Sequence, residues 1–175
     1  MEEFFLYNNR RFPNYVFSDR VKSSIFIEFD TVFTPSFLKT LRNFLVQKDI
    51  KQLKIQNIEP KDYFFNETID VSKLPDSFIE SACLEKVQEY IDTPASFYML
   101  TELGLIFPIE NSEMFCLYLD RRFSLAIIGS SEMSNAIFFQ EFKIIDLFDY
   151  LTMTFQGDEP PQEITKKMKK YWTGE

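Results

Sequence analysis

Three short apolar segments near the middle of the chain limit the fold more than any other feature of the sequence. Leu105–Ile109, Met114–Leu119 and Phe123–Gly129 are bulky and almost free of charged side chains. Segments of this length and composition are typical of buried β-strands. Asp120-Arg121-Arg122 separates the last two segments and supplies a chain reversal. We therefore predict that these two segments pair as an antiparallel hairpin.

Further strands are expected where short extended segments lie between turn residues. They are Tyr15–Phe17, Ser24–Phe29, Gln52–Ile58, Asp62–Ile69 and Ala136–Phe142. The alternation expected of a strand is clearest at Ile25, Ile27 and Phe29. Glu59-Pro60 is typical of a turn and divides two of the expected strands.

Helical periodicity is strongest after Thr34-Pro35, a pair typical of an N-cap followed by a first-turn proline. Apolar side chains then recur at helical spacing, which predicts an amphipathic helix over 35–48. The same argument predicts helices over 76–91, from 143 to 155, and from Pro161 onward.

The order of these elements indicates the fold class. Groups of strands alternate irregularly with helices, and the chain ends in two consecutive helices. This order favours an α+β fold rather than regular parallel winding. We expect a single domain over residues 1–175, with a largely antiparallel sheet packed against about four helices on one face.

Composition excludes several kinds of catalytic site. The 175 residues include no histidine, and the four glycines stand isolated. Histidine-based triads and nearly all zinc sites are therefore excluded, and glycine-rich phosphate loops are not expected. The 21 phenylalanines are expected mainly in the core. These observations predict a protein without a catalytic residue, metal or cofactor.

Paired carboxylates are the chemistry that composition leaves open. Asp146 with Asp149, and Glu110 with Glu113, lie three positions apart. Each pair has the spacing to share a hard cation or to perform general acid–base chemistry. The other interpretation, a solvated helix or loop surface, is favoured because neither pair lies in a D-x-D-x-D loop.

The sequence predicts a cytoplasmic location for the protein. Cys83 and Cys116 lie in apolar surroundings without a CxxC motif, so we expect buried thiols rather than a disulfide. The first twelve residues have acidic groups and no apolar stretch of signal-peptide length. Apolar runs such as Leu125–Ile128 are far shorter than the ~20 residues of a membrane-spanning helix.

Charge is distributed unevenly along the chain. The formal net charge is −8, but residues 1–58 carry +3, residues 59–163 carry −14 and residues 164–175 carry +3. An acidic region repels nucleic acid and attracts a cationic protein. Solubility alone is the other explanation for a net charge of this size.

The expected partner-binding surface combines this acidity with aromatic side chains. The second predicted helix carries carboxylates on its outer face, and an aromatic triple (63–65) lies among acidic residues. Aromatic side chains are enriched in the cores of protein interfaces. The predicted contact residues are Asp62, Tyr63, Glu67, Asp70, Glu85, Glu89 and Asp92.

The C-terminal half resembles a known class of proteins. The segments LYLDRRFSLAIIGSS (117–131) and NAIFFQEFKIIDLFDYL (135–151), followed by a late helix with Trp172, are similar to bacterial toxin-immunity proteins. These small acidic proteins belong to polymorphic-toxin systems, including contact-dependent growth inhibition. The resemblance is one of class and covers residues 97–172. It implies an immunity protein that occludes the basic surface of a toxin domain, such as a nuclease.

Two alternatives remain at this stage. One is a non-catalytic interaction or regulatory subunit of phage or mobile-element type, whose acidity imitates DNA. The other is a carboxylate-dependent metal enzyme. The sequence leaves the oligomeric state and the identity of the partner open.

Overall fold

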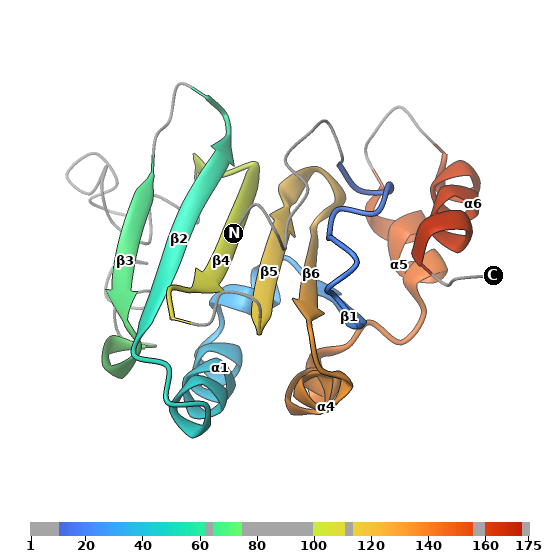
Figure 1. Ribbon diagram of the computed structural model, residues 1–175. Coiled ribbons are helices and arrows are strands. Elements are labelled where there is room, and N and C mark those ends of the chain that lie inside the picture. Colours follow the sequence, from blue (N-terminus) through green and yellow to red (C-terminus); the bar gives the residue numbers. More distant parts are fainter. Residues whose placement is uncertain (1–10, 62–64, 75–99, 111–113, 156–159, 173–175) are drawn as a thin grey trace.

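A six-stranded sheet organises the molecule in the computed structural model (Figure 1). The structure describes residues 11–61, 65–74, 100–110, 114–155 and 160–172. The strands are β1 (Ser23–Glu28), β2 (Gln52–Glu59), β3 (Asn66–Asp70), β4 (Leu103–Pro108), β5 (Phe115–Asp120) and β6 (Leu125–Ser130). Their order across the sheet is β1-β6-β5-β4-β2-β3, and every neighbouring pair is antiparallel. The predicted α+β class with a largely antiparallel sheet is confirmed.

The three central strands are buried along their whole length, with every residue of β4, β5 and β6 shielded from solvent. The predicted hairpin is formed by β5 and β6, with Asp120 opposite Leu125. Its connection is the 3-10 turn η5 (Arg121–Phe123) followed by Ser124, which adopts a left-handed conformation (φ 50°). Because successive strand residues point to opposite faces, complete burial requires cover on both faces.

The first face is covered by helix α1 (Pro35–Gln47). The side chain of Thr34 accepts a hydrogen bond from the backbone N–H of Phe37, and Pro35 occupies the first turn, which confirms the predicted start of this helix. The buried side chains of α1 pack into one cluster with alternate residues of the sheet, including Ile106, Leu117 and Ile128. The short 3-10 turns η1 (Asp30–Phe33) and η2 (Val71–Lys73) border this layer.

The segment expected as a strand over Ala136–Phe142 is helical, so that prediction is wrong. It forms α4 (Met133–Ala136) and the 3-10 turn η6 (Ile137–Phe142). Phe139 and Phe142 lie three positions apart, and both contact Phe37 of α1, with ring centroids 5.6 and 5.2 Å away. A helical turn directs both rings toward the same helix, whereas alternation along a strand would have placed them on opposite faces.

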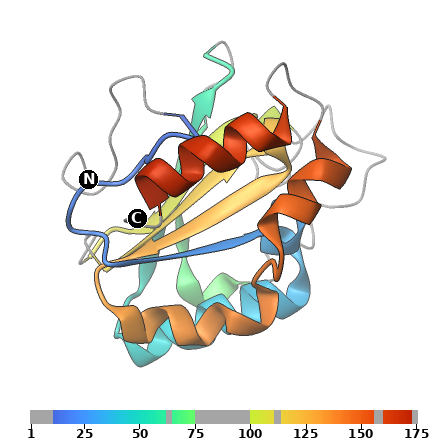
Figure 2. The same ribbon diagram turned by 90° about the vertical axis from the view of Figure 1, so that its right-hand side faces the viewer.

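The second face is covered by an extended N-terminal segment and by helices α5 (Leu147–Thr154) and α6 (Pro161–Trp172) (Figure 2). Phe12, Val16 and Phe17 of the N-terminal segment are completely buried. The indole Nε1 of Trp172 donates a hydrogen bond to the carbonyl of Pro13, 3.0 Å away. The expectation of helices on one face only is therefore wrong, because the sheet lies between two layers.

Three other predicted elements differ from the structure or lie outside the described residues. Tyr15–Phe17 is not a strand of the sheet but part of the segment that crosses its second face. The strand expected over Asp62–Ile69 is Asn66–Asp70 among the described residues. The helix predicted over 76–91 lies outside the described residues.

Gly129 shows how closely the N-terminal segment packs on the sheet. A Cβ atom at this position would lie only 2.7 Å from the ring of Phe17, which is completely buried. We expect Gly129→Ala to lower the free energy of unfolding by about 1–3 kcal/mol, because overpacking displaces a side chain that has no free space. Urea unfolding followed by fluorescence measures this change.

A double-mutant cycle tests the cause of this loss. Phe17→Leu removes the ring, so Gly129→Ala should cost much less in the Phe17→Leu background than in the wild type. Strictly additive effects would contradict contact between these two residues as the cause.

Candidate functional site

The predicted contact surface falls only partly within the described residues. Asp62, Tyr63, Glu85, Glu89 and Asp92 lie outside them. Glu67 and Asp70 are both exposed on the edge strand β3. Hydrogen bonds from the side chain of Ser72 and from its backbone N–H, 2.8 Å from the carboxylate, lower the pKa of Asp70. Three positions separate Glu67 from Asp70, so strand alternation directs them to opposite faces of the sheet.

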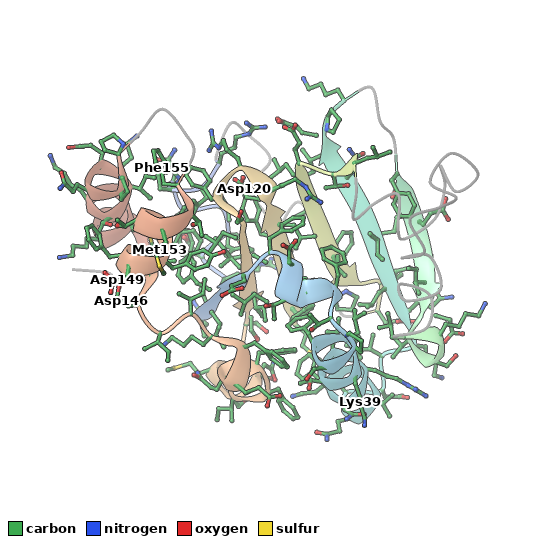
Figure 3. The ribbon with its side chains drawn as sticks, turned by 180° about the vertical axis from the view of Figure 1, so that it is seen from behind. Lys39, Asp120, Asp146, Asp149, Met153 and Phe155 are labelled. Atoms are coloured by element: carbon green, nitrogen blue, oxygen red, sulfur yellow. The ribbon has the colours of Figure 1, made fainter. Side chains whose placement is uncertain are left out.

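A pocket of about 520 Å³ lies beside β1, at the other edge of the sheet. Its walls come from the end of β1, from η1, from the end of η6 with the segment that follows it, and from α5. The lining residues are Glu28, Thr31, Glu141, Phe142, Lys143, Ile144, Ile145, Asp146, Asp149, Tyr150 and Met153. Figure 3 shows Asp146, Asp149 and Met153 close together on the outer side of α5.

The pocket forms where the chain leaves the sheet edge and begins α5. Lys143 forms a single β-bridge with Ile27, and the N–H of Ile144 donates to the carbonyl of Phe26 at 2.9 Å. The chain then turns away, and the carboxylate of Asp146 caps α5 by accepting from two backbone N–H groups, both at 3.0 Å. The edge contact and the cap therefore hold the pocket wall at both ends.

Negative charge predominates in this pocket. Four carboxylates, those of Glu28, Glu141, Asp146 and Asp149, line it together with the one ammonium group of Lys143. An acidic concavity of this kind raises the local concentration of cations.

Tyr150 contributes a partly buried phenol to the pocket wall. Its hydroxyl donates to the carbonyl of Ser124 at 2.5 Å. Burial raises the pKa of Tyr150 to about 12, and the nearby carboxylates of Glu28 and Asp30 add to the effect. The phenol is therefore neutral at physiological pH and supplies a polar but uncharged wall.

Apolar side chains lie exposed beside these carboxylates. The side chain of Ile145 is 100% exposed and that of Met153 is 79% exposed, and both line the pocket. A single exposed apolar side chain is common on protein surfaces. Here two of them lie at one acidic pocket, and protein interfaces have the same composition, with an apolar core and a polar rim.

The paired carboxylates considered as cation sites are only partly described. Asp146 caps α5, while Asp149 lies in its first turn. Glu110 is exposed, and Glu113 lies outside the described residues. Among the residues that the structure describes, no three His, Cys, Asp or Glu side chains converge in a way that could hold a metal ion. Cys116 is a buried free thiol, as predicted, and burial raises its pKa.

A second polar cluster is buried beneath the N-terminal segment. Asp120 is only 3% exposed. Its carboxylate accepts a hydrogen bond from the hydroxyl of Tyr118 at 2.9 Å, and the same hydroxyl accepts from the N–H of Phe12 at 3.3 Å. Arg122 donates to the carbonyl of Phe12 at 3.1 Å. This cluster attaches the N-terminal segment to the β5–β6 hairpin.

Burial has an electrostatic cost at Asp120. Loss of water raises the pKa of the Asp120 carboxyl, while the Tyr118 hydrogen bond and the positive charges of Arg122 and Arg11 reduce the effect. The surrounding bonds are directed at the backbone of Phe12, so we interpret the cluster as an anchor for the chain.

Sequence reasoning missed much of both clusters, for different reasons. Glu28 belongs to the N-terminal segment with net charge +3, so no local signal connects it with Asp149. Asp120 was expected as a turn residue, but Tyr118 lies two positions earlier on the same strand face. That spacing is a weak signal for a buried polar pair.

Comparisons of the chain with protein-family models, curated protein sequences and solved structures give no match. Among the described residues, no helix has the length and apolar character required to cross a membrane.

Asp120 generates a prediction about pH. Because its pKa is raised above the ordinary value of 3.8 in the folded state, the folded chain binds this proton more tightly than the unfolded chain. The contribution of Asp120 to stability should therefore be lost as the pH rises from about 4 through its folded-state pKa. Asp120→Asn removes this dependence and retains an oxygen that accepts from Tyr118.

Urea unfolding of the wild type and of Asp120→Asn at several pH values between 4 and 8 measures the difference. We expect the stability of the variant, relative to the wild type, to improve with increasing pH up to the folded-state pKa of Asp120 and to stay constant above it. A difference that is constant over this range would show that Asp120 does not titrate in the folded protein as proposed.

Proposed function

We propose that this protein is a non-catalytic binding protein of the immunity type, which neutralises a cationic protein, such as a toxin domain, by direct contact. The observation that carries the proposal is the pocket beside β1, which is lined by four carboxylates together with exposed apolar side chains; the carboxylates are those of Glu28, Glu141, Asp146 and Asp149. This combination supports binding and requires no reacting group.

Charge and apolar contact have separate roles in this proposal. The carboxylates accelerate encounter with a basic partner, and this effect weakens with salt because screening acts over about 8 Å at physiological ionic strength. The exposed side chains of Ile145 and Met153 lose water on contact and slow dissociation. A nuclease has a basic cleft for its phosphate substrate and is therefore a suitable partner.

The surface expected from the sequence remains a separate prediction. β3, which carries Glu67, and β1 lie at opposite edges of the sheet, five strand spacings or roughly 24 Å apart. One small contact does not include both edges. Exposed acidic residues remote from β1 therefore provide a matched control for the pocket.

The test compares two variants that remove the same formal charge. Glu28→Gln/Asp149→Asn neutralises two carboxylates in the pocket, and Glu102→Gln/Glu110→Gln neutralises two exposed carboxylates at the two ends of β4. Each form is used as bait in a lysate of the native host, and bound proteins are quantified by mass spectrometry. A basic protein should bind the wild type and the control about tenfold better than the pocket variant.

The recovered protein is then expressed alone and together with each form. Growth should be inhibited by the partner alone, restored by the wild type and by the control, and restored poorly by the pocket variant. Equal protection by both double variants would remove the pocket from the proposal. A bound protein that does not affect growth would contradict the immunity role.

A further inference from the structure

We propose that the pocket beside β1 takes an arginine side chain of the partner, together with an adjacent apolar side chain of the same segment. This inference deepens the proposed function and rests on it. It specifies the chemical group that occupies the site, and the observations that carry it are the arrangement of charge, aromatic rings and apolar surface around one cavity.

Carboxylates from several elements line one cavity. Glu28 ends β1, Glu141 lies in η6, and Asp149 lies in the first turn of α5, so three separate elements contribute negative charge to one cavity. At about 520 Å³ the pocket is within the range of roughly 300–1,000 Å³ found for small-ligand sites. It has room for a long basic side chain and part of its neighbour.

Aromatic walls favour arginine over lysine. Phe142 and Tyr150 are among the residues that line the same pocket. A guanidinium group is planar, stacks on aromatic rings and binds carboxylates through two parallel hydrogen bonds, whereas an ammonium group is compact and strongly hydrated. The protein already uses this packing internally, with Arg121 4.5 Å from the ring centre of Phe29 and Arg122 4.3 Å from that of Phe123.

The N-terminus of α5 is already occupied by acidic side chains and does not offer a site for an anion. Two backbone N–H groups of its first turn donate hydrogen bonds to the carboxylate of Asp146. Asp149 adds a second negative charge to this turn. These acids offset the positive end of the helix dipole. The pocket therefore remains selective for a cation at the point where a helix would otherwise attract a phosphate or a carboxylate.

A substitution of Lys143 should change the binding affinity in the direction opposite to a substitution of the carboxylates. It supplies the positive charge among the pocket-lining residues, and its side chain is exposed. An incoming guanidinium is repelled by this ammonium group, so Lys143→Gln should strengthen binding while Glu28→Gln/Asp149→Asn weakens it. General damage to the fold would weaken binding in both variants.

The exposed apolar side chains beside the pocket favour a partner segment in which the arginine has an apolar neighbour. Ile145 and Met153 are exposed beside the carboxylates, so a residue next to the arginine contacts them as the guanidinium enters. A leucine on each side of the arginine provides this contact in either chain direction. The peptide Ac-Leu-Arg-Leu-NH2 is therefore a minimal probe, with Ac-Leu-Lys-Leu-NH2 and Ac-Leu-Gln-Leu-NH2 as comparisons.

The experiment is a titration of the 15N-labelled full chain with each peptide, followed by NMR. The arginine peptide should shift the amide signals of Ile145, Asp149 and Met153 saturably, with a dissociation constant on the order of 1 mM. We expect the lysine peptide to bind about threefold more weakly and the glutamine peptide not to saturate.

The variants determine whether the pocket is responsible. Glu28→Gln/Asp149→Asn should weaken binding about fivefold, Lys143→Gln should strengthen it about twofold, and Glu102→Gln/Glu110→Gln should leave it unchanged. The NMR spectrum of each variant reports directly whether the fold is intact. Equal binding of the glutamine peptide, signal shifts confined to other surfaces, or no saturable binding of the arginine peptide would overturn the inference.

This result is independent of the growth assay. If the arginine peptide occupies the pocket but no partner affects growth, the pocket assignment holds and the immunity role fails. If the growth assay depends on the pocket while the lysine and arginine peptides bind equally, the immunity role holds and the preference for arginine fails.

Discussion

Burial of both faces of the three central strands is the constraint on which the rest of the structure depends. In register across β4, β5 and β6, Leu105, Tyr118 and Ile127 face one layer, while the alternating positions face the other. Each fully buried Leu or Ile side chain contributes about 1.5–3 kcal/mol relative to the exposed state. The N-terminal segment, α5 and α6 are therefore required on the second face as much as α1 is on the first.

Part of the second face is covered by the N-terminal segment, which has no regular secondary structure, and this segment needs polar anchors. Buried N–H and C=O groups that lie outside a helix or sheet require other hydrogen-bond partners. Tyr118 and Arg122 bind both backbone groups of Phe12, and Trp172 binds the carbonyl of Pro13. The buried carboxylate of Asp120 holds Tyr118 in position and introduces a charge that is sensitive to pH.

The pocket is a consequence of how the sheet ends. Beyond β1 the chain makes a single bridge at Lys143, after which the backbone turns to begin α5. Exposed sheet edges commonly carry charged side chains that oppose unwanted strand pairing. Here the carboxylates line a pocket together with exposed apolar side chains, and the proposed binding of a basic partner rests on this combination.

Local patterns in the sequence determined the elements whose cause is local. The cap at Thr34, the stripe of α1 and the DRR reversal between β5 and β6 each depend on residues a few positions apart, so these predictions are confirmed. The Ala136–Phe142 segment was mistaken for a strand because its aromatic and apolar residues fit either period, and packing against Phe37 decided between them.

The convergence of charge was decided only by the tertiary structure. The sequence by itself determined a histidine-free, acidic chain with an antiparallel core, which favoured binding over catalysis. Linear charge counting directed attention to residues 59–163, yet Glu28 of the pocket comes from a segment with net positive charge. Side-chain periodicity is a local property, whereas the meeting of Glu28 with Asp149 depends on the position of β1 at the sheet edge and on where α5 begins.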